Sequence, residues 1–176
     1  MEKDQTNIYR RGADNGFLLG ILFIILFASM VMSEYLALLS LIMAALFLSV
    51  PFVMFIFLRN SCRKAGYVRE YLEMWVEGIV TFACGGIILA VAVYVFMKFI
   101  DPEYIVRQVD TLLEVYRDID DGRSREVVDL LKLIKENNAY PTPRMISVQL
   151  FMTTCFTGSI LSMAIALLVK SLDRRK

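Results

Sequence analysis

Three glutamates lie in or beside apolar segments, where a carboxyl group could take part in proton transfer or ion binding. Glu34 interrupts an otherwise uncharged run from Gly16 to Leu58, and Glu73 and Glu77 lie one helical turn apart in YVREYLEMWVEG. A carboxyl group inside a membrane can hold a proton or an ion, and two acids one turn apart can serve as acid and base or bind a divalent cation. A plainer interpretation fits each position better. Glu34 then marks a solvated turn, and Glu73 and Glu77 are balanced by nearby basic residues.

Other catalytic chemistry has little support in the sequence. The chain contains no histidine, which is the commonest general base and metal ligand, and its three cysteines form no CxxC pair. The segment DIDDG, counted from Asp118, has Arg123 and Asp129 where a calcium-binding EF-hand needs Gly and Glu. We therefore predict no catalytic, cofactor-binding or metal-binding residues, and a protein that is not an enzyme.

The composition indicates a membrane protein. Hydrophobic residues make up 57% of the 176 residues, and the mean hydropathy is +0.58, above that of ordinary soluble domains. No removable signal peptide is expected before the first apolar run. A single helix over residues 16–58 would be about 64 Å long, roughly twice the hydrocarbon thickness, so the chain must turn back near Ser33 and Glu34. Ser33 is expected to cap the second span. The predicted spans are residues 16–32, 35–58, 75–99 and 145–169.

The segment between the third and fourth spans differs from the rest. Residues 101–144 show two amphipathic helical patterns, with Asp101 as the predicted N-cap, Pro102 at the first helical position, and a turn near Asp121 and Gly122. The predicted fold is all-α: one polytopic membrane domain over residues 1–176, with four transmembrane helices and an extracytoplasmic amphipathic helical hairpin. Basic residues gather at both termini and in the second loop, so we expect cytoplasmic N- and C-termini.

Small residues recur at four-residue spacing, which lets helix backbones approach closely in lipid. They are Gly12, Gly16 and Gly20; Gly86 and Ala90; and Thr154, Gly158, Ser162 and Ala166. We expect these ridges to pack within one bundle, with homo-oligomer formation as the alternative. Tyr67, Tyr71 and Trp75 share one helical face and are expected to anchor the third span at the membrane interface.

The segment YLEMWVEGIVTFACGGIILAVAVYVFMKFIDPEY, followed by an amphipathic segment and a terminal span, resembles the four-span family called domain of unknown function 4199. The resemblance covers almost the whole chain. It implies the inner membrane of envelope-bearing bacteria and carries no activity and no site residues. It also implies, as a candidate partner, a polyprenyl-phosphate glycosyltransferase, because genes of the two kinds are often neighbours.

Two functions are therefore predicted, with an enzyme using Glu73 and Glu77 as a third and weaker idea. The first is a non-enzymatic scaffold or partner-binding subunit. The alternative is a small transporter or oligomeric channel, for which Pro51 and the Gly85–Gly86 pair could break the spans as in transporters. The expected partners are the lipid bilayer, a membrane-associated protein and a second copy of the chain, with no nucleic acid.

Overall fold

The computed structural model describes residues 2–33, 37–65, 70–117, 119 and 122–173, and these residues contain helices and short turns but no strand. The helices are α1 (Glu2–Met32), α2 (Ala37–Ala65), α3 (Tyr71–Val95), the π-helix η1 (Phe96–Ile100), α4 (Tyr104–Arg117), α5 (Gly122–Glu136) and α6 (Pro143–Asp173). The predicted all-α fold is confirmed. Helix α6 begins at Pro143, two residues before the predicted fourth span.

Four segments are long and apolar enough to cross a bilayer, as the sequence predicted. They are Ile8–Met32, Leu39–Arg63, Tyr71–Ile100 and Pro143–Leu172, in place of the predicted 16–32, 35–58, 75–99 and 145–169. The candidate spans differ from the predicted bounds mainly at their polar ends, where helices continue past the apolar core. The third begins four residues earlier than predicted and so includes Glu73, whereas Glu77 already lay inside the predicted span.

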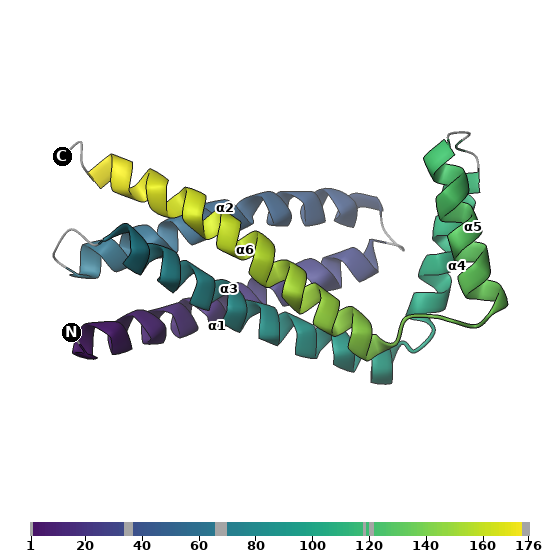
Figure 1. Ribbon diagram of the computed structural model, residues 1–176, viewed down its shortest axis with the longest axis horizontal. Helices are drawn as coiled ribbons and strands as arrows, with labels where there is room; N and C mark the ends of the chain where they lie inside the picture. Colours follow the sequence, from purple (N-terminus) through teal and green to yellow (C-terminus); the bar gives the residue numbers. More distant parts are fainter. Residues whose placement is uncertain (1, 34–36, 66–69, 118, 120–121, 174–176) are drawn as a thin grey trace. The chain divides into compact units, whose positions relative to one another are not determined.

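The chain packs as two compact units, residues 1–92 with 149–176 and residues 93–148. The first unit contains α1, α2 and most of α3 and α6. At one end of this unit lie the start of α1, the end of α2, the start of α3 and the end of α6, which is the arrangement that four alternating spans require (Figure 1).

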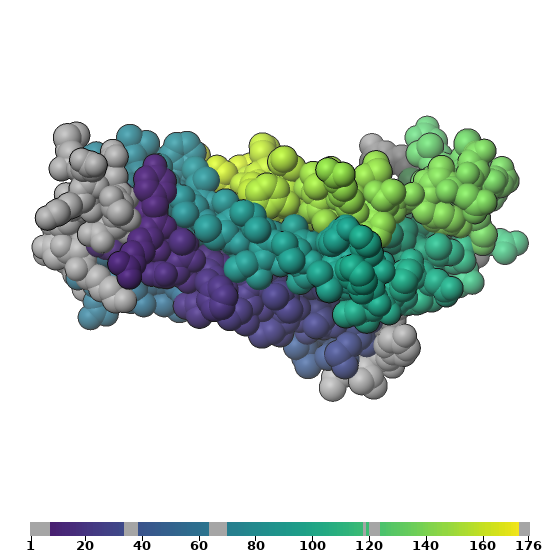
Figure 2. All heavy atoms as spheres, turned by 90° about the horizontal axis from the view of Figure 1, so that it is seen from below, coloured from purple at the N-terminus to yellow at the C-terminus, as the bar shows by residue number. Residues whose placement is uncertain are grey.

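In the first unit α3 lies between α1 and α6 (Figure 2). The ridge of Gly12, Gly16 and Gly20 on α1 faces α3. A Cβ atom on Gly16 would lie 2.6 Å from the Cβ of Cys84 and 2.8 Å from the carbonyl oxygen of Thr81, so only glycine allows this approach. The predicted use of this ridge within one bundle is confirmed.

The other side of α3 packs equally closely against α6. A Cβ atom on Gly78 would lie 2.5 Å from the Ser162 hydroxyl, and Gly158 of α6 has no room for one beside the Phe82 ring. A Cβ atom on Gly86 would be 3.3 Å from Thr154. The small residues of α6 therefore also pack within the chain.

The expectation of broken spans is wrong. Helix α2 continues through Pro51, and α3 continues through Gly85 and Gly86. The glycine pair is used for packing instead: a Cβ atom on Gly85 would lie 3.2 Å from the carbonyl oxygen of Gly16, while Gly86 faces α6. Such close neighbours on both sides hold α3 in one continuous helix.

The sequence predicted that Ser33 caps the start of the second span. In the structure Ser33 instead caps the end of the first span, directly after α1. Its backbone N–H donates to the Ser29 carbonyl (3.0 Å), and its hydroxyl donates to the Met30 carbonyl (2.6 Å). The last carbonyls of a helix lack intrahelical donors, which a serine directly after the helix can supply. Helix α2 starts only at Ala37. Glu34 lies outside the described residues.

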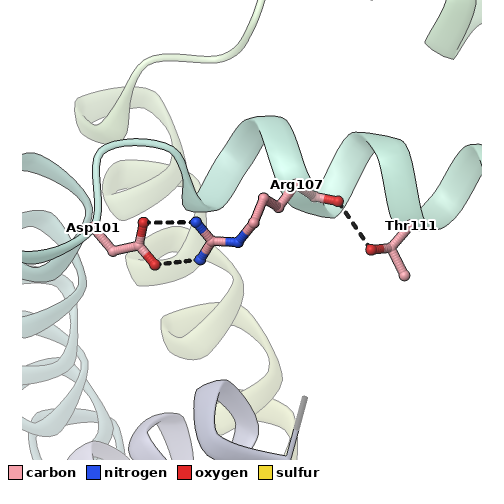
Figure 3. A network of polar contacts seen from close by, with 3 residues as sticks. All are labelled: Asp101, Arg107 and Thr111. Atoms are coloured by element: carbon pink, nitrogen blue, oxygen red, sulfur yellow. Dashed lines mark hydrogen bonds and ion pairs between the residues drawn. The ribbon is translucent and has the colours of Figure 1, made fainter. Parts of the chain in front are cut away.

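The second unit joins the end of η1 to α4 through a packed turn. The Asp101 carboxylate binds the Arg107 guanidinium through both oxygens, and the Thr111 hydroxyl donates to the Arg107 carbonyl (Figure 3). The hydrogen bond from Arg107 lowers the pKa of Asp101, and the backbone N–H groups of Glu103 and Tyr104 help, which is how an N-cap interacts with its helix. Asp101 therefore acts as the predicted cap, but Pro102 lies in the turn before Tyr104 and not at the predicted first helical position. Asp121, in the predicted second turn, lies outside the described residues.

Candidate functional site

The most unusual polar residue of the first unit is Glu77 in α3. Its side chain is completely buried, and it lies six residues after the start of the third candidate span, about 9 Å along the helix. Thr81, one turn later, is also completely buried and donates its hydroxyl to the Glu77 carbonyl (2.8 Å). An acid at this position needs partners, because a buried carboxylate without hydrogen bonds is strongly destabilising.

Two other helices supply those partners. The Ser61 hydroxyl of α2, itself 5% exposed, donates to Glu77 Oε1, and Asn15 Nδ2 of α1 donates to the same oxygen at 3.4 Å. One turn before Asn15, the Arg11 guanidinium contacts the Ser61 carbonyl (3.5 Å). We call Arg11, Asn15, Ser61 and Glu77 the Glu77 cluster; it joins α1, α2 and α3.

The packing of α1 brings the cluster together. Gly12 lies between Arg11 and Asn15, and a Cβ atom at Gly12 would lie 3.1 Å from the Glu77 carbonyl oxygen. The missing side chain lets the α1 backbone approach α3 at the level of Glu77. The amide of Asn15 and the hydroxyl of Ser61 can then reach the carboxylate.

This cluster can hold the Glu77 carboxyl group in one position. Serine and asparagine side chains each contain hydrogen-bond donors, and those of Ser61 and Asn15 reach the carboxyl group from two other helices. Arg11 brings a positive charge to the same place. The arrangement can therefore lock three helices together.

Glu77 is buried and does not lie at a solvated rim. Its side chain accepts hydrogen bonds from Ser61 and Asn15. The predicted balance with basic residues of the second loop stays a prediction, because the side chains of Lys64 and Arg69 lie outside the described part of the chain. Glu73 is half-buried in the first turn of α3, where the helix dipole favours an acid. Among the described residues no group of three or more metal-binding side chains occurs. The two acids therefore have different surroundings: Glu77 is completely buried, whereas Glu73 is half-buried.

The aromatic residues of α3 also face inward. The rings of Tyr71 and Trp75 stack with centroids 6.4 Å apart, and Trp75 Nε1 donates to the Ser159 carbonyl of α6 (3.2 Å). The Tyr71 hydroxyl is buried without a hydrogen-bond partner in the described part of the chain. Both rings are half-buried and pack against neighbouring side chains and α6, and their predicted role as anchors at the membrane interface stays a prediction. Tyr67 lies outside the described residues.

Arg11, Asn15 and Ser61 were missed from the sequence. A weak signal existed, because Asn15 follows Arg11 by one turn and lies beside the Gly12–Gly16 ridge, so it had to face the same neighbouring helix. Ser61 had no such signal, since it lies in the polar stretch RNSCRK at the end of a span.

The comparison with protein families decides the relationship of this chain to known proteins. The family described as "Protein of unknown function (DUF4199)" matches residues 14–171. The chain belongs to this family. The match confirms the resemblance seen in the sequence, and the DUF4199 region includes Asn15, Ser61 and Glu77, with Arg11 just before it. Searches of curated proteins and of solved structures found no match.

Proposed function

We propose that this DUF4199 protein is a non-enzymatic integral membrane protein that acts as a scaffold or partner-binding subunit. The observation that supports this role is the tight fit of α3, which has no room for a Cβ atom at Gly16 on one side or at Gly158 on the other. Helices packed this closely cannot shift without losing many contacts. A helical bundle of fixed shape presents the same surface at all times, which a scaffold needs in order to bind a partner protein.

The proposed orientation places both termini in the cytoplasm of a bacterium, with the protein in the inner membrane. Basic residues then form the cytoplasmic rim at the end of α2, where Arg59 and Arg63 are exposed and the Arg59 guanidinium lies 5.9 Å from the centre of the Phe55 ring. This rim suits an acidic protein surface or anionic lipid headgroups. A polyprenyl-phosphate glycosyltransferase is the candidate partner that the family resemblance suggests.

Purification from native membranes at the natural expression level tests the scaffold role. We expect a protein partner in stoichiometric amount, and we expect Arg59→Glu with Arg63→Glu to release it. Lys132→Glu is the matched control, because Lys132 is an equally basic, exposed residue on α5. Tyr71 is unsuitable for this test, since its hydroxyl is buried. Recovery of lipid alone with the unchanged rim would contradict the proposal.

A small proton-coupled transporter is the second candidate, because Glu77 is buried in a span and intramembrane acids often form part of a proton path. In vesicles containing a pH-sensitive dye, such a transporter would move protons down an imposed gradient. Glu77→Gln should abolish this flux, whereas Glu73→Gln should leave it unchanged. Absence of flux with the unchanged protein would favour the scaffold.

A further inference from the structure

Five apolar side chains among the described residues of 104–136 are exposed when α4 and α5 pack together. They are Leu112 and Val115 of α4, Ile119 just after it, and Leu130 and Leu133 of α5. Leu130 and Leu133 are 63% and 57% exposed. Leu112, Val115 and Ile119 follow one another at spacings of three and four residues, which is the spacing of residues on one face of an α-helix.

The exposed residues of both helices lie on the same side of the pair. Counted at 100° per residue from the middle of the buried Ile105 and Val109 of α4, Leu112 is rotated by roughly 40° and Val115 by roughly 100° in one sense. Counted from the middle of the half-buried Val127, Leu131 and Ile134 of α5, Leu130 is rotated by roughly 70° and Leu133 by roughly 130° in that same sense. Because consecutive helices in contact run in opposite directions, rotations in the same sense bring both sets to one side. We call these five residues the apolar side.

One ion pair of the unit lies on the opposite side. Lys135 of α5 donates to the Asp110 carboxylate of α4 at 2.6 Å. The same rotation places both residues away from Leu112 and Leu133, and Lys132 and Arg117 lie there too. The pair of helices is thus mainly apolar on one side, where Glu126 adds one exposed acid one turn before Leu130, and charged on the other.

The chain enters and leaves the second unit through the ends of two candidate spans. The unit begins with the end of the third span, where Phe99 and Ile100 are exposed, and it closes with the start of the fourth, where Met145 is exposed. Only residues 101–103 separate the third span from α4, and residues 137–142 separate α5 from α6. Within the unit, Tyr104 packs edge-on against Phe96 with ring centroids 5.5 Å apart, and Asp101 binds Arg107 (Figure 3). Connections this short keep both helices close to the end of a span.

We infer that α4 and α5 lie on the membrane with the apolar side in the headgroup region of the bilayer. Amphipathic helices bind lipid in this way, with the apolar face at the boundary of the acyl chains and the charged face in water. The occupant of the apolar side is then the same membrane that the four spans cross. This inference does not depend on the scaffold role.

Fluorescent labels at matched neighbouring positions test the inference. The full chain, with its three cysteines replaced by alanine, carries one new cysteine from Val115→Cys or Leu133→Cys, or from the control changes Glu114→Cys or Lys132→Cys. Each labelled protein is reconstituted in vesicles of phosphatidylethanolamine and phosphatidylglycerol. Labels at Val115 and Leu133 should be quenched by lipids with a nitroxide near the headgroup and should lose most quenching by aqueous iodide. The control labels should show the reverse.

Three outcomes would overturn the inference. Equal iodide quenching at all four positions would mean that the apolar side faces water. Protection that disappears on dilution into excess lipid would mean that a second copy covers it. Protection found in native membranes but not in vesicles of the purified protein would mean that another protein covers it. All four positions are exposed, and circular dichroism of each variant checks that the helices have formed.

Discussion

At the scale of single residues, a carboxylate in a span is stable here because two helices bring donors to it. Ser61 and Asn15 donate to one oxygen of Glu77, and the amide and hydroxyl would themselves lose a partner without it. In this cluster the carboxylate supplies the acceptor for the donors of Ser61 and Asn15, and those donors supply the hydrogen bonds that the buried carboxylate needs. This interdependence predicts different effects for substitutions that keep or remove the acceptor.

Glu77→Ala should lower the free energy of unfolding by about 1–3 kcal/mol, because it leaves buried donors without an acceptor. Glu77→Gln should cost less, since its amide oxygen can still accept from Ser61. Thermal unfolding in detergent, followed by circular dichroism, measures both. Glu73→Gln is the control and should have a small effect; a loss at Glu73 equal to that of Glu77→Ala would contradict the distinction between the two acids.

The Asp101–Arg107 pair predicts a pH dependence at the start of α4. The hydrogen bond from Arg107 lowers the pKa of the Asp101 carboxyl below the value of 3.8 that is ordinary for aspartate. The stabilising contribution is therefore complete above that ordinary value and is lost as the pH falls through the lower pKa of the folded state. Hydrogen exchange of the α4 backbone, corrected for intrinsic rates, should show protection lost only in this acidic range.

Arg107→Gln supplies the control for that measurement, because it removes the charge that lowers the pKa. In this variant the acid-induced loss of protection of the α4 backbone should begin at higher pH, and the loss should be smaller than in the unchanged protein. The Lys135–Asp110 pair adds a separate dependence at high pH. Its hydrogen bond raises the pKa of Lys135 above 10.5, so the contribution of Lys135 is complete below that value and is lost as the pH rises through the raised pKa. An identical pH profile in the variant would show that Arg107 does not set the titration of Asp101.

At the scale of helices, α3 is the element on which the first unit depends. It contacts α1 through Gly12, Gly16 and Gly20, and it contacts α6 through Gly78 and Phe82. Lipid offers no hydrophobic driving force between helices, so these close contacts supply the association through van der Waals packing. Loss of one small residue should therefore separate a whole pair of helices.

Gly16→Leu should lower the free energy of unfolding by roughly 1–3 kcal/mol, the usual cost of overpacking. The new side chain would meet the Cβ of Cys84 and the Thr81 carbonyl, neither of which can move away without shifting α3. Ala13→Leu, an exposed position on the same helix, is the matched control. Unfolding in a graded series of denaturing detergent measures both variants. Equal stability of the two would mean that the seam of α1 and α3 is looser than described.

At the scale of the whole molecule, four spans determine that both termini lie on one side of the membrane, and charge determines which side. In a Cys-free background, Gly122→Cys and Glu34→Cys should react with an impermeant maleimide in intact cells, because the second loop and both termini are expected inside. Arg63→Cys should react only after lysis. Labelling of Arg63→Cys in intact cells would reverse the orientation.

Local patterns in the sequence were enough to predict the number of spans, the amphipathic helices between the third and fourth, the cap at Asp101 and the glycine seam of α1. Each of these depends on residues a few positions apart: an apolar stretch of sufficient length, a helical period, or a small residue every fourth position. The seam could be foreseen because a ridge of small residues has one use in lipid, which is to let another helix approach.

Only the tertiary structure decided what Glu77 does. Its partners Asn15 and Ser61 are 62 and 16 residues away in the chain, and no local period relates the three positions. Tertiary neighbours likewise decided that Gly85 and Gly86 pack against α1 and α6 without breaking the helix, and that Tyr71 and Trp75 turn inward. Hydrophobic periodicity shows which face of a helix is apolar, but the fate of a polar side chain depends on which distant donors the fold brings within hydrogen-bonding distance.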